Sequence, residues 1–234
     1  KYLNKKNDGK QNIPAYGAMV SYMDFCVGRV LNKIEELGLE ENTIVILTSD
    51  NGGQIIATSN SPLKGQKGNL SEGGIRVPLI IKWPGVTSEG SDNDTPVSVV
   101  YFYPTIAEMA NANLSEERPK DGESIVPLLT GKGKLKREAI FWHLTSYNGN
   151  GISNSLLWQP PGGAIRKGDW KLIENFTDGS VQLYNLNKDI GEKNNLKDNY
   201  PEKKKELLNE LKAWQNKTKA PVPREINPIY EENS

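Results

Sequence analysis

The sequence is poor in the residues that form disulfides and nitrogen- or sulfur-ligated metal sites. Cys26 is the single cysteine and His143 the single histidine among 234 residues, which excludes an internal disulfide framework and Cys- or His-rich metal centres. No apolar run approaches the roughly 18–20 residues that span a bilayer, so we expect no membrane span. Basic and acidic residues, 29 of each, cancel to a net charge of zero, and we expect no nucleic-acid partner. Any bound metal would need oxygen ligands.

The composition that remains is that of a globular protein. Hydrophobic residues make up 36% and charged residues 25% of the chain, which is enough for one or two domains with a core. The sequence changes in character near residue 132, and this predicts a first domain over residues 1–131 and a second over 132–234. The chain starts at Lys1 without an initiator Met or signal peptide, which fits either a mature protein or a piece of a longer one.

The first part predicts alternating helices and strands. Apolar residues at steps of three and four predict a helix that begins near Pro14 and is capped by Gly38. The β-branched run at 43–48 is typical of a strand buried on both faces, as in a parallel sheet. A second strand is predicted at 77–83 and a helix at 104–110. This order indicates an α/β layered fold.

The second part predicts a smaller α+β subdomain. Residues 139–143 form a short strand candidate, and residues 147–163, rich in Gly, Asn, Ser and Pro, predict a long loop. Two antiparallel strands at 170–174 and 181–186 are joined by a turn signal. A helix follows Pro201 and carries an apolar stripe.

The end of the first predicted strand carries oxygen donors. Asp50 and Asn51 follow it directly and precede Gly52 and Gly53. Ligands of open α/β sheets bind beyond the carboxyl ends of strands, and a carboxylate beside an amide suits Ca²⁺ or Mg²⁺. The same four residues are also a common turn sequence, so the tetrapeptide alone leaves both interpretations open.

Residues 61–78 form a glycine-rich segment with two lysines and an arginine, leading into the second predicted strand. Flexible backbone with cations is what a tetrahedral oxyanion requires. The spacing does not match the Walker phosphate-binding loop. By composition alone, a solvated surface loop is an equal alternative.

Together these segments resemble the type I sulfatases, which are arylsulfatase-like members of the alkaline phosphatase superfamily. Their order, spacing and neighbours all agree, and the resemblance covers most of the chain. The segments that carry it most clearly are 48–53 (TSDNGG), 62–68 (PLKGQKG), 72–78 (EGGIRVP), 163–173 (GAIRKGDWKLI) and 183–186 (LYNL). The resemblance implies part of an alkaline-phosphatase-like α/β sandwich, followed by the smaller subdomain with its antiparallel sheet and C-terminal helix.

The resemblance also implies roles for individual residues. Asp50 and Asn51 match the paired calcium ligands of the family, and Lys67 matches the catalytic lysine that contacts the sulfate ester. Lys64 is a candidate substrate-side cation, and His143 lies where related glycan sulfatases place polar substrate-pocket residues. Residues 72–76 would support Lys67 without contacting the substrate. A packed, hydrogen-bonded histidine is the alternative for His143.

Two departures from the family pattern matter. The sequence Tyr101-Phe102-Tyr103 stands where the family often has an acidic residue. No Cys-x-Pro-x-Arg or Ser-x-Pro-x-Arg motif occurs, and Cys26 is followed by Val-Gly-Arg, so the precursor of the formylglycine nucleophile is absent from this chain. We therefore expect the C-terminal half of a sulfatase, inactive without the missing N-terminal half.

The substrate implied by the resemblance is a sulfated small molecule or, by analogy with bacterial relatives, a sulfated glycan. Trp158 in the long loop could contact a sugar, and a tryptophan that only fills a hydrophobic gap is an equal alternative. The family also implies a periplasmic or secreted location. Two alternatives remain: a phosphodiesterase or phosphonate hydrolase of the same superfamily, and a non-catalytic glycan-binding relative. Two transition-metal ions would favour the first alternative, and an upstream sequence without the nucleophile motif the second.

Overall fold

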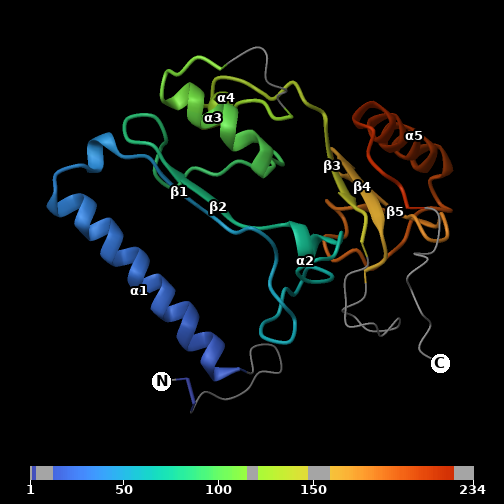
Figure 1. Ribbon diagram of the computed structural model, residues 1–234, viewed down its shortest axis with the longest axis horizontal. Coiled ribbons are helices and arrows are strands. Elements are labelled where there is room, and N and C mark those ends of the chain that lie inside the picture. The colour runs from blue at the N-terminus through green and yellow to red at the C-terminus, as the bar shows by residue number, and fades with distance from the viewer. Residues whose placement is uncertain (1, 4–12, 115–120, 147–158, 224–234) are drawn as a thin grey trace. The chain divides into compact units, whose positions relative to one another are not determined.

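The computed structural model describes residues 2–3, 13–114, 121–146 and 159–223 (Figure 1). Its contacts divide the chain into two compact units. The first unit contains Pro14–Ser49 and Pro78–Ile140, and the second contains Asp50–Val77 together with the described residues from Phe141 onward. The predicted domain division between residues 131 and 132 stays a prediction, since compact units are not the domains of a whole protein.

The long helix of the first unit confirms the helix predicted from the apolar periodicity. Helix α1 spans Pro14–Glu36. Its C-terminal end is capped by Gly38, whose φ of 66° is left-handed. Leu39 N–H donates to Ile34 O at 3.0 Å across that end. This six-residue closure needs a residue without a Cβ penalty at the cap, which explains the glycine. A 3₁₀ turn, η1, follows at Glu40–Asn42.

The two strands of the first unit correct the expected parallel arrangement. Strand β1 (Val45–Thr48) pairs antiparallel with β2 (Leu79–Lys82). None of the residues of either strand is buried in the structure described, so the prediction of a strand buried on both faces was wrong for this chain. An apolar β-branched run favours a strand but does not specify its partner. Thr48, the last residue of β1, lies opposite Leu79, the first residue of β2. The segment between the two strands therefore starts and ends at the same end of the pair.

The remaining elements of the first unit are short. A 3₁₀ turn, η2 (Val99–Tyr101), runs into α3 (Phe102–Met109), which confirms the predicted helix near 104–110, and α4 spans Val126–Leu129. Thr105 Oγ1 donates to Tyr101 O at 2.6 Å and accepts the amide of Ile125 at 3.0 Å. Tyr101 is almost fully buried and its ring lies under the Arg137 guanidinium, 5.7 Å from the ring centroid. Tyr101 is thus a core residue here.

The second unit is built on a four-stranded sheet of order β3-β4-β5-β6. The strands are β3 (Ala139–Leu144), β4 (Gly162–Lys167), β5 (Trp170–Asn175) and β6 (Val181–Asn185). Strands β4, β5 and β6 pair antiparallel, which confirms the two antiparallel strands predicted near 170 and 181. The helices of the unit are α2 (Glu72–Ile75) and α5 (Pro201–Thr218), and α5 confirms the helix predicted after Pro201.

Strand β4 was not predicted, because its first two residues are glycines at the end of a loop-like sequence. The packing explains them. A Cβ on Gly162 would lie 2.6 Å from Glu174 O, and one on Gly163 would lie 3.0 Å from Gln215 Nε2. The strand needs glycines for close approach, and local composition cannot distinguish that need from a turn.

The strand register assigns the two faces of this sheet to different partners. Arg166 pairs with Lys171, which pairs with Tyr184, so these three residues share one face. Ala164, Ile173 and Tyr184 pack there with Leu70 of the glycine-rich segment. The opposite face packs against α5, and its fully buried residues are Ile165, Leu172, Leu183, Leu207 and Leu211. The sheet therefore lies between the C-terminal helix and the segment that contains the candidate site.

Candidate active site

Backbone hydrogen bonds hold the turn after β1 against the glycine-rich segment. Gly52 N–H donates to Gly74 O at 3.0 Å, and Lys67 N–H donates to Gly53 O at 3.2 Å. The Asn60 side chain bridges them: its amide nitrogen donates to Gly53 O at 2.7 Å and Gly65 O at 3.0 Å. The backbone of Lys67 is thereby fixed beside the turn that begins with Asp50 and Asn51.

The close approach at this junction requires glycine. A Cβ on Gly52 would lie 1.8 Å from Gly73 O, and one on Gly73 would lie 2.5 Å from the carbonyl oxygens of Lys64 and Gly65. Real Cβ atoms do not approach backbone this closely, so a side chain at either position would push the two segments apart. The glycines of both motifs are explained by the packing of one motif on the other.

Asp50 and Asn51 offer a carboxylate and an amide in succession, with Asp50 exposed and Asn51 half-buried. This donor chemistry fits a hard divalent cation. Ca²⁺, one such cation, takes six to eight oxygen ligands. Among the described residues, however, no three His, Cys, Asp or Glu side chains come together as a metal site. Asp50 and Asn51 alone do not make up such a ligand set.

The two candidate lysines are placed differently. Lys67 is exposed and is held through its backbone. Lys64 Nζ donates to the Tyr184 hydroxyl at 3.3 Å and lies 5.4 Å from the centroid of that ring, so the structure brings Lys64 to the sheet. The Tyr184 hydroxyl donates onward to Gln182 Oε1 at 2.9 Å. Burial, with the negative charges of Glu192 and Asp189, raises the pKa of Tyr184 to about 12.

His143 lies apart from the other predicted site residues of the second unit. Its ring is 5.0 Å from Phe176 and 6.1 Å from Trp214 of α5, measured between centroids, and Nε2 is 2.7 Å from Pro221 O. Its neighbour on β3, Trp142, packs with Leu70 instead. Successive strand residues face opposite ways, so His143 is on the α5 side of the sheet and the glycine-rich segment is on the other. Its substrate-pocket role stays a prediction, and Trp158 lies outside the described residues.

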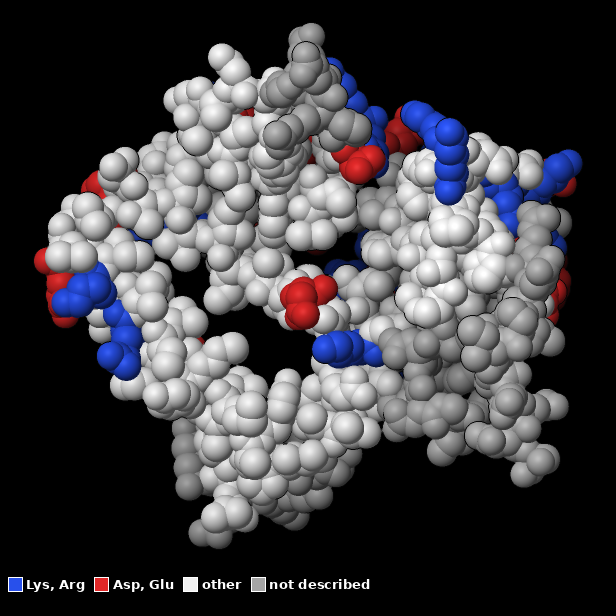
Figure 2. Space-filling view, viewed as in Figure 1, with Lys and Arg blue, Asp and Glu red and all other residues white. Residues whose placement is uncertain are grey.

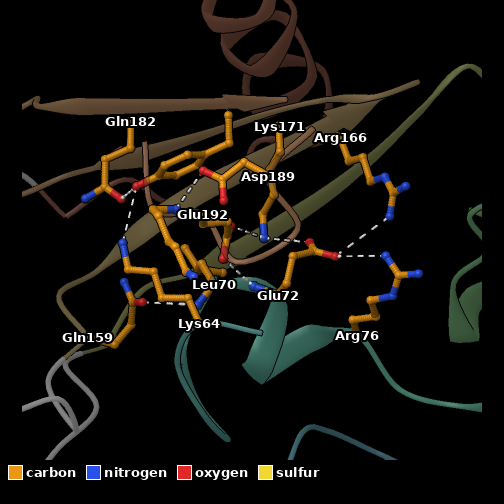
Figure 3. Close-up of polar contacts among 12 residues, drawn as sticks. Lys64, Leu70, Glu72, Arg76, Gln159, Arg166, Lys171, Gln182, Asp189 and Glu192 are labelled. Carbon is orange, nitrogen blue, oxygen red and sulfur yellow. Dashed lines mark hydrogen bonds and ion pairs between the residues drawn. The ribbon is translucent and has the colours of Figure 1, made fainter. Parts of the chain in front are cut away.

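A buried cluster of charges links the glycine-rich segment to the sheet, and sequence reasoning found only part of it. Lys171 Nζ donates to Glu72 Oε1 at 2.8 Å and pairs with Glu192 Oε1 at 2.9 Å. Figure 3 shows these three side chains pointing toward one another from β5, α2 and the loop after β6. Arg76 and Arg166 approach the other Glu72 oxygen at 3.7 and 3.9 Å. Burial lowers the pKa of Arg166, and Glu72 opposes that effect.

On the face in view in Figure 2, basic and acidic side chains form small separate groups among uncharged residues. No helix in the described residues is both long enough and apolar enough to cross a membrane.

Comparison with known proteins places the chain among sulfatases. A family model described as sulfatase matches residues 1–112, and one described as N-sulphoglucosamine sulphohydrolase, C-terminal, matches residues 66–220. A sulfatase of Formosa agariphila is 38% identical, over 95% of this chain and 43% of its own length. The chain thus spans less than half the length of this relative.

Solved structures give the same result. Ps i-CgsB, in complex with k-i-k-neocarrahexaose, matches with a TM-score of 0.74 and 28% identity, covering 90% of this chain and 44% of its own. BT4656, in complex with its substrate D-glucosamine-2-N,6-O-disulfate, matches with a TM-score of 0.71 and 29% identity, covering 88% and 41%. A phosphonate monoester hydrolase from Silicibacter pomeroyi, at 21% identity and a TM-score of 0.65, shares the fold.

The fold belongs to the alkaline-phosphatase-like α/β class, as the sequence predicted. The two matched family models and the relative at 38% identity carry the assignment further. The chain belongs to the sulfatase family. Membership of this family suggests a bound divalent metal.

Proposed function

We propose that this chain is the C-terminal portion of a sulfatase that hydrolyses a sulfate ester of a glycan. Family membership supports sulfate ester hydrolysis. The substrate class is supported by the two solved neighbours, one in complex with a neocarrahexaose and the other with a sulfated glucosamine. The nucleophile, a formylglycine by resemblance to the family, would come from the N-terminal half, and the enzyme would act in the periplasm or outside the cell.

The observation that carries this proposal is the backbone bond from Lys67 N–H to Gly53 O. This bond supports the proposal because it holds the backbone of Lys67 beside the turn with Asp50 and Asn51. In the complete enzyme, Lys67 would bind a nonbridging oxygen of the sulfate group and offset the charge that develops as the ester bond breaks. Such preorganised cations lower the barrier because they need no reorganisation during the reaction.

Asp50 and Asn51 would hold the metal, and we propose calcium because both donors are hard oxygens. Bound calcium would supply a fixed positive charge next to the sulfate. The carboxylate of Asp50 would balance that charge and hold the cation in place, and the Asn51 amide oxygen would add a neutral ligand. These two residues contribute position and charge, while the remaining ligands would come from the N-terminal half.

The alternatives have weaker support. A phosphonate hydrolase is supported by fold alone, because that neighbour is only 21% identical. Relative turnover of an aryl sulfate and an aryl phosphonate by the full-length enzyme distinguishes the two activities. A protein that turned over neither ester but bound sulfated glycan would instead be the non-catalytic relative.

The first test replaces Lys67 in the full-length enzyme. Lys67→Ala should lower kcat/KM for an aryl sulfate by about 10²–10³-fold, the typical cost of removing one preorganised stabilising group. The matched control is Lys205→Ala, which removes an exposed lysine of α5 in the same unit and should leave turnover unchanged. Equal turnover by both variants would contradict the role of Lys67.

The same preparation tests the metal. Asp50→Ala should lose bound calcium and activity together, as measured by elemental analysis and steady-state kinetics, because a carboxylate ligand cannot be replaced by a methyl group. Asp198→Ala, at an exposed position in the same unit, is the control. Normal calcium content in Asp50→Ala would show that the ligand assignment is wrong.

A further inference from the structure

We propose that Glu192 is a positioning residue for the sulfate site, acting through a buried carboxylate–ammonium–carboxylate bridge to the segment that carries Lys67. The bridge consists of Glu192, Lys171 and Glu72. Its effect on turnover rests on the proposed function of Lys67, whereas its effect on the order of the segment does not. Glu192 has no direct contact with substrate in this proposal.

The first support is burial together with short ion-pair distances. The side chains of Lys171, Glu72 and Glu192 expose 0%, 2% and 0% of their surface. Ions removed from water this fully are costly unless their partners are close and well oriented. Here the ammonium group lies 2.8 Å from one carboxylate and 2.9 Å from the other, so any separation of the three groups carries a large penalty. The bridge therefore fixes the distance between β5 and α2.

The second support is that one carboxylate makes two different connections. Glu192 Oε1 pairs with Lys171 on the sheet, and Glu192 Oε2 accepts the backbone N–H of Glu72 at 2.8 Å. Glu72 is the first residue of α2. Glu192 therefore joins the sheet to the main chain of the glycine-rich segment as well as to a side chain within it, and it specifies where that segment lies.

The third support is that the two residues after Glu72 are hydrogen-bonded to the segments of the candidate site. Gly73, the next residue, donates its N–H to Lys64 O at 2.7 Å, and Gly74 O accepts Gly52 N–H at 3.0 Å. The first bond closes the loop that contains Lys67. The second reaches the turn that contains Asp50 and Asn51. A displacement of Glu72 would therefore move both halves of the candidate site.

The fourth support is the backbone at Glu192. Its φ of 50° is left-handed, a conformation that costs free energy for any residue other than glycine. Gly191 beside it packs closely on the same segment, since a Cβ there would lie 2.9 Å from Pro62 O. A glycine at 192 would adopt this conformation without strain, so the carboxylate is present at an energetic cost. Its two connections explain that cost.

The test uses two substitutions in the full-length enzyme. Glu192→Gly removes the carboxylate and relieves the backbone, and Glu192→Gln removes the charge but keeps an oxygen that can accept the Glu72 N–H. Glu210→Gln is the control, because it makes the same chemical change to a carboxylate that pairs with Lys167 at 2.9 Å but is 30% exposed. Three quantities are measured: tryptic cleavage after Lys67 under native conditions, inhibition by inorganic sulfate, and turnover of an aryl sulfate.

We expect Glu192→Gly to accelerate cleavage after Lys67 at least tenfold, and to raise KM and the sulfate inhibition constant together by about tenfold. Glu192→Gln should recover part of each effect because it retains the Glu72 hydrogen bond. The control should change none of them. A general loss of stability would raise cleavage throughout the chain without this selective change in sulfate affinity.

Unchanged cleavage after Lys67 in both Glu192 variants would overturn the proposal, whatever the activity. If Glu192→Gly does not fold, as judged by circular dichroism, the Gln variant decides alone. Faster cleavage with unchanged sulfate affinity would confirm that Glu192 orders the segment, but it would remove the role of Lys67 on which the proposed function depends. The failures of the two proposals are thus distinguishable.

Discussion

At the scale of single residues, neighbours decide what a side chain does. Lys64 and Lys67 are three positions apart in one motif and both are exposed, yet Lys64 Nζ donates to Tyr184 while the backbone of Lys67 is held beside the turn after β1. Lys171, a third lysine, is fully buried between two carboxylates. Three residues of one type therefore serve as a tether, a candidate sulfate contact and a structural bridge.

Tyr184 makes a pH-dependent contribution to stability. A tyrosine in the unfolded chain loses its proton near pH 10, whereas burial and the nearby Glu192 and Asp189 raise the pKa of native Tyr184 to about 12. Between these values the unfolded state binds fewer protons than the native state, so the free energy of unfolding falls as pH rises. The contribution is fully present below about pH 10.

The measurement is urea unfolding of wild type and Tyr184→Phe at about pH 9 and about pH 11. Wild type should lose more stability between the two than the variant, because phenylalanine has no proton to release. Other groups that titrate in this range contribute equally to both proteins and cancel in the difference. Equal losses would show that the native and unfolded pKa values of Tyr184 are the same.

The residues of the candidate site were only partly predictable from the sequence. Asp50, Asn51, Lys64 and Lys67 stand in contiguous motifs, and the structure places their segments together. Glu192 carries no such signal, since the residue it bonds to lies 120 positions away in the chain. A partner so distant in sequence is fixed by the fold of the sheet between them.

At the scale of elements, close packing explains both what was predicted and what was missed. Helices α1, α3 and α5 and the β5–β6 pair follow from local sequence signals, whereas the four-residue helices α2 and α4 were not predicted. Strand β4 does not follow from local signals, because it depends on glycines that fit against Glu174 and Gln215. The antiparallel β1–β2 pair does not either, because it depends on where the chain returns after 30 residues. Interactions across the chain decide both.

The glycines give a paired prediction. A Cβ on Gly74 would lie 2.2 Å from Asn69 O and 2.4 Å from Gln66 O, so Gly74→Ala should lower the free energy of unfolding by about 1–3 kcal/mol, the usual cost of overpacking. In contrast, no described atom lies within 4 Å of a Cβ on Gly28 in α1. Gly28→Ala should raise stability by about 0.5–1 kcal/mol, as expected within a helix.

Urea denaturation followed by circular dichroism measures both variants. Hydrogen exchange of the Gly52 amide, which donates to Gly74 O, adds a local readout that should rise in Gly74→Ala alone. If the two variants have the same stability, then the close approach at Gly74 is not a constraint on the fold.

At the scale of the whole molecule, the chain shows an unusual apolar surface. All 23 residues of α1 are described and none is buried. Met19, Tyr22 and Met23 expose 69%, 65% and 60% of their surface. Contiguous exposed apolar residues of this extent mark an interaction surface, and under the proposed function the N-terminal half of the enzyme would cover it.

This predicts the behaviour of the chain on its own. Residues 1–234 alone should bind a hydrophobic dye such as ANS and should not hydrolyse an aryl sulfate, because the nucleophile is absent. Co-expression with the N-terminal half should lower dye binding, slow hydrogen exchange in α1 and restore turnover. Hydrolysis by residues 1–234 alone at the rate of the full enzyme would contradict both the missing nucleophile and the proposed division of labour.

The distance in sequence between Glu192 and Glu72 also has a consequence for biosynthesis. Ribosomes release a chain from its N-terminus onward, so Asp50, Asn51 and Lys67 emerge well before the carboxylate that anchors their segment. A transcript with a premature stop codon between Lys67 and Glu192 would still encode Asp50, Asn51 and Lys67. Its product would lack the carboxylate that joins their segment to Lys171 and to the Glu72 amide.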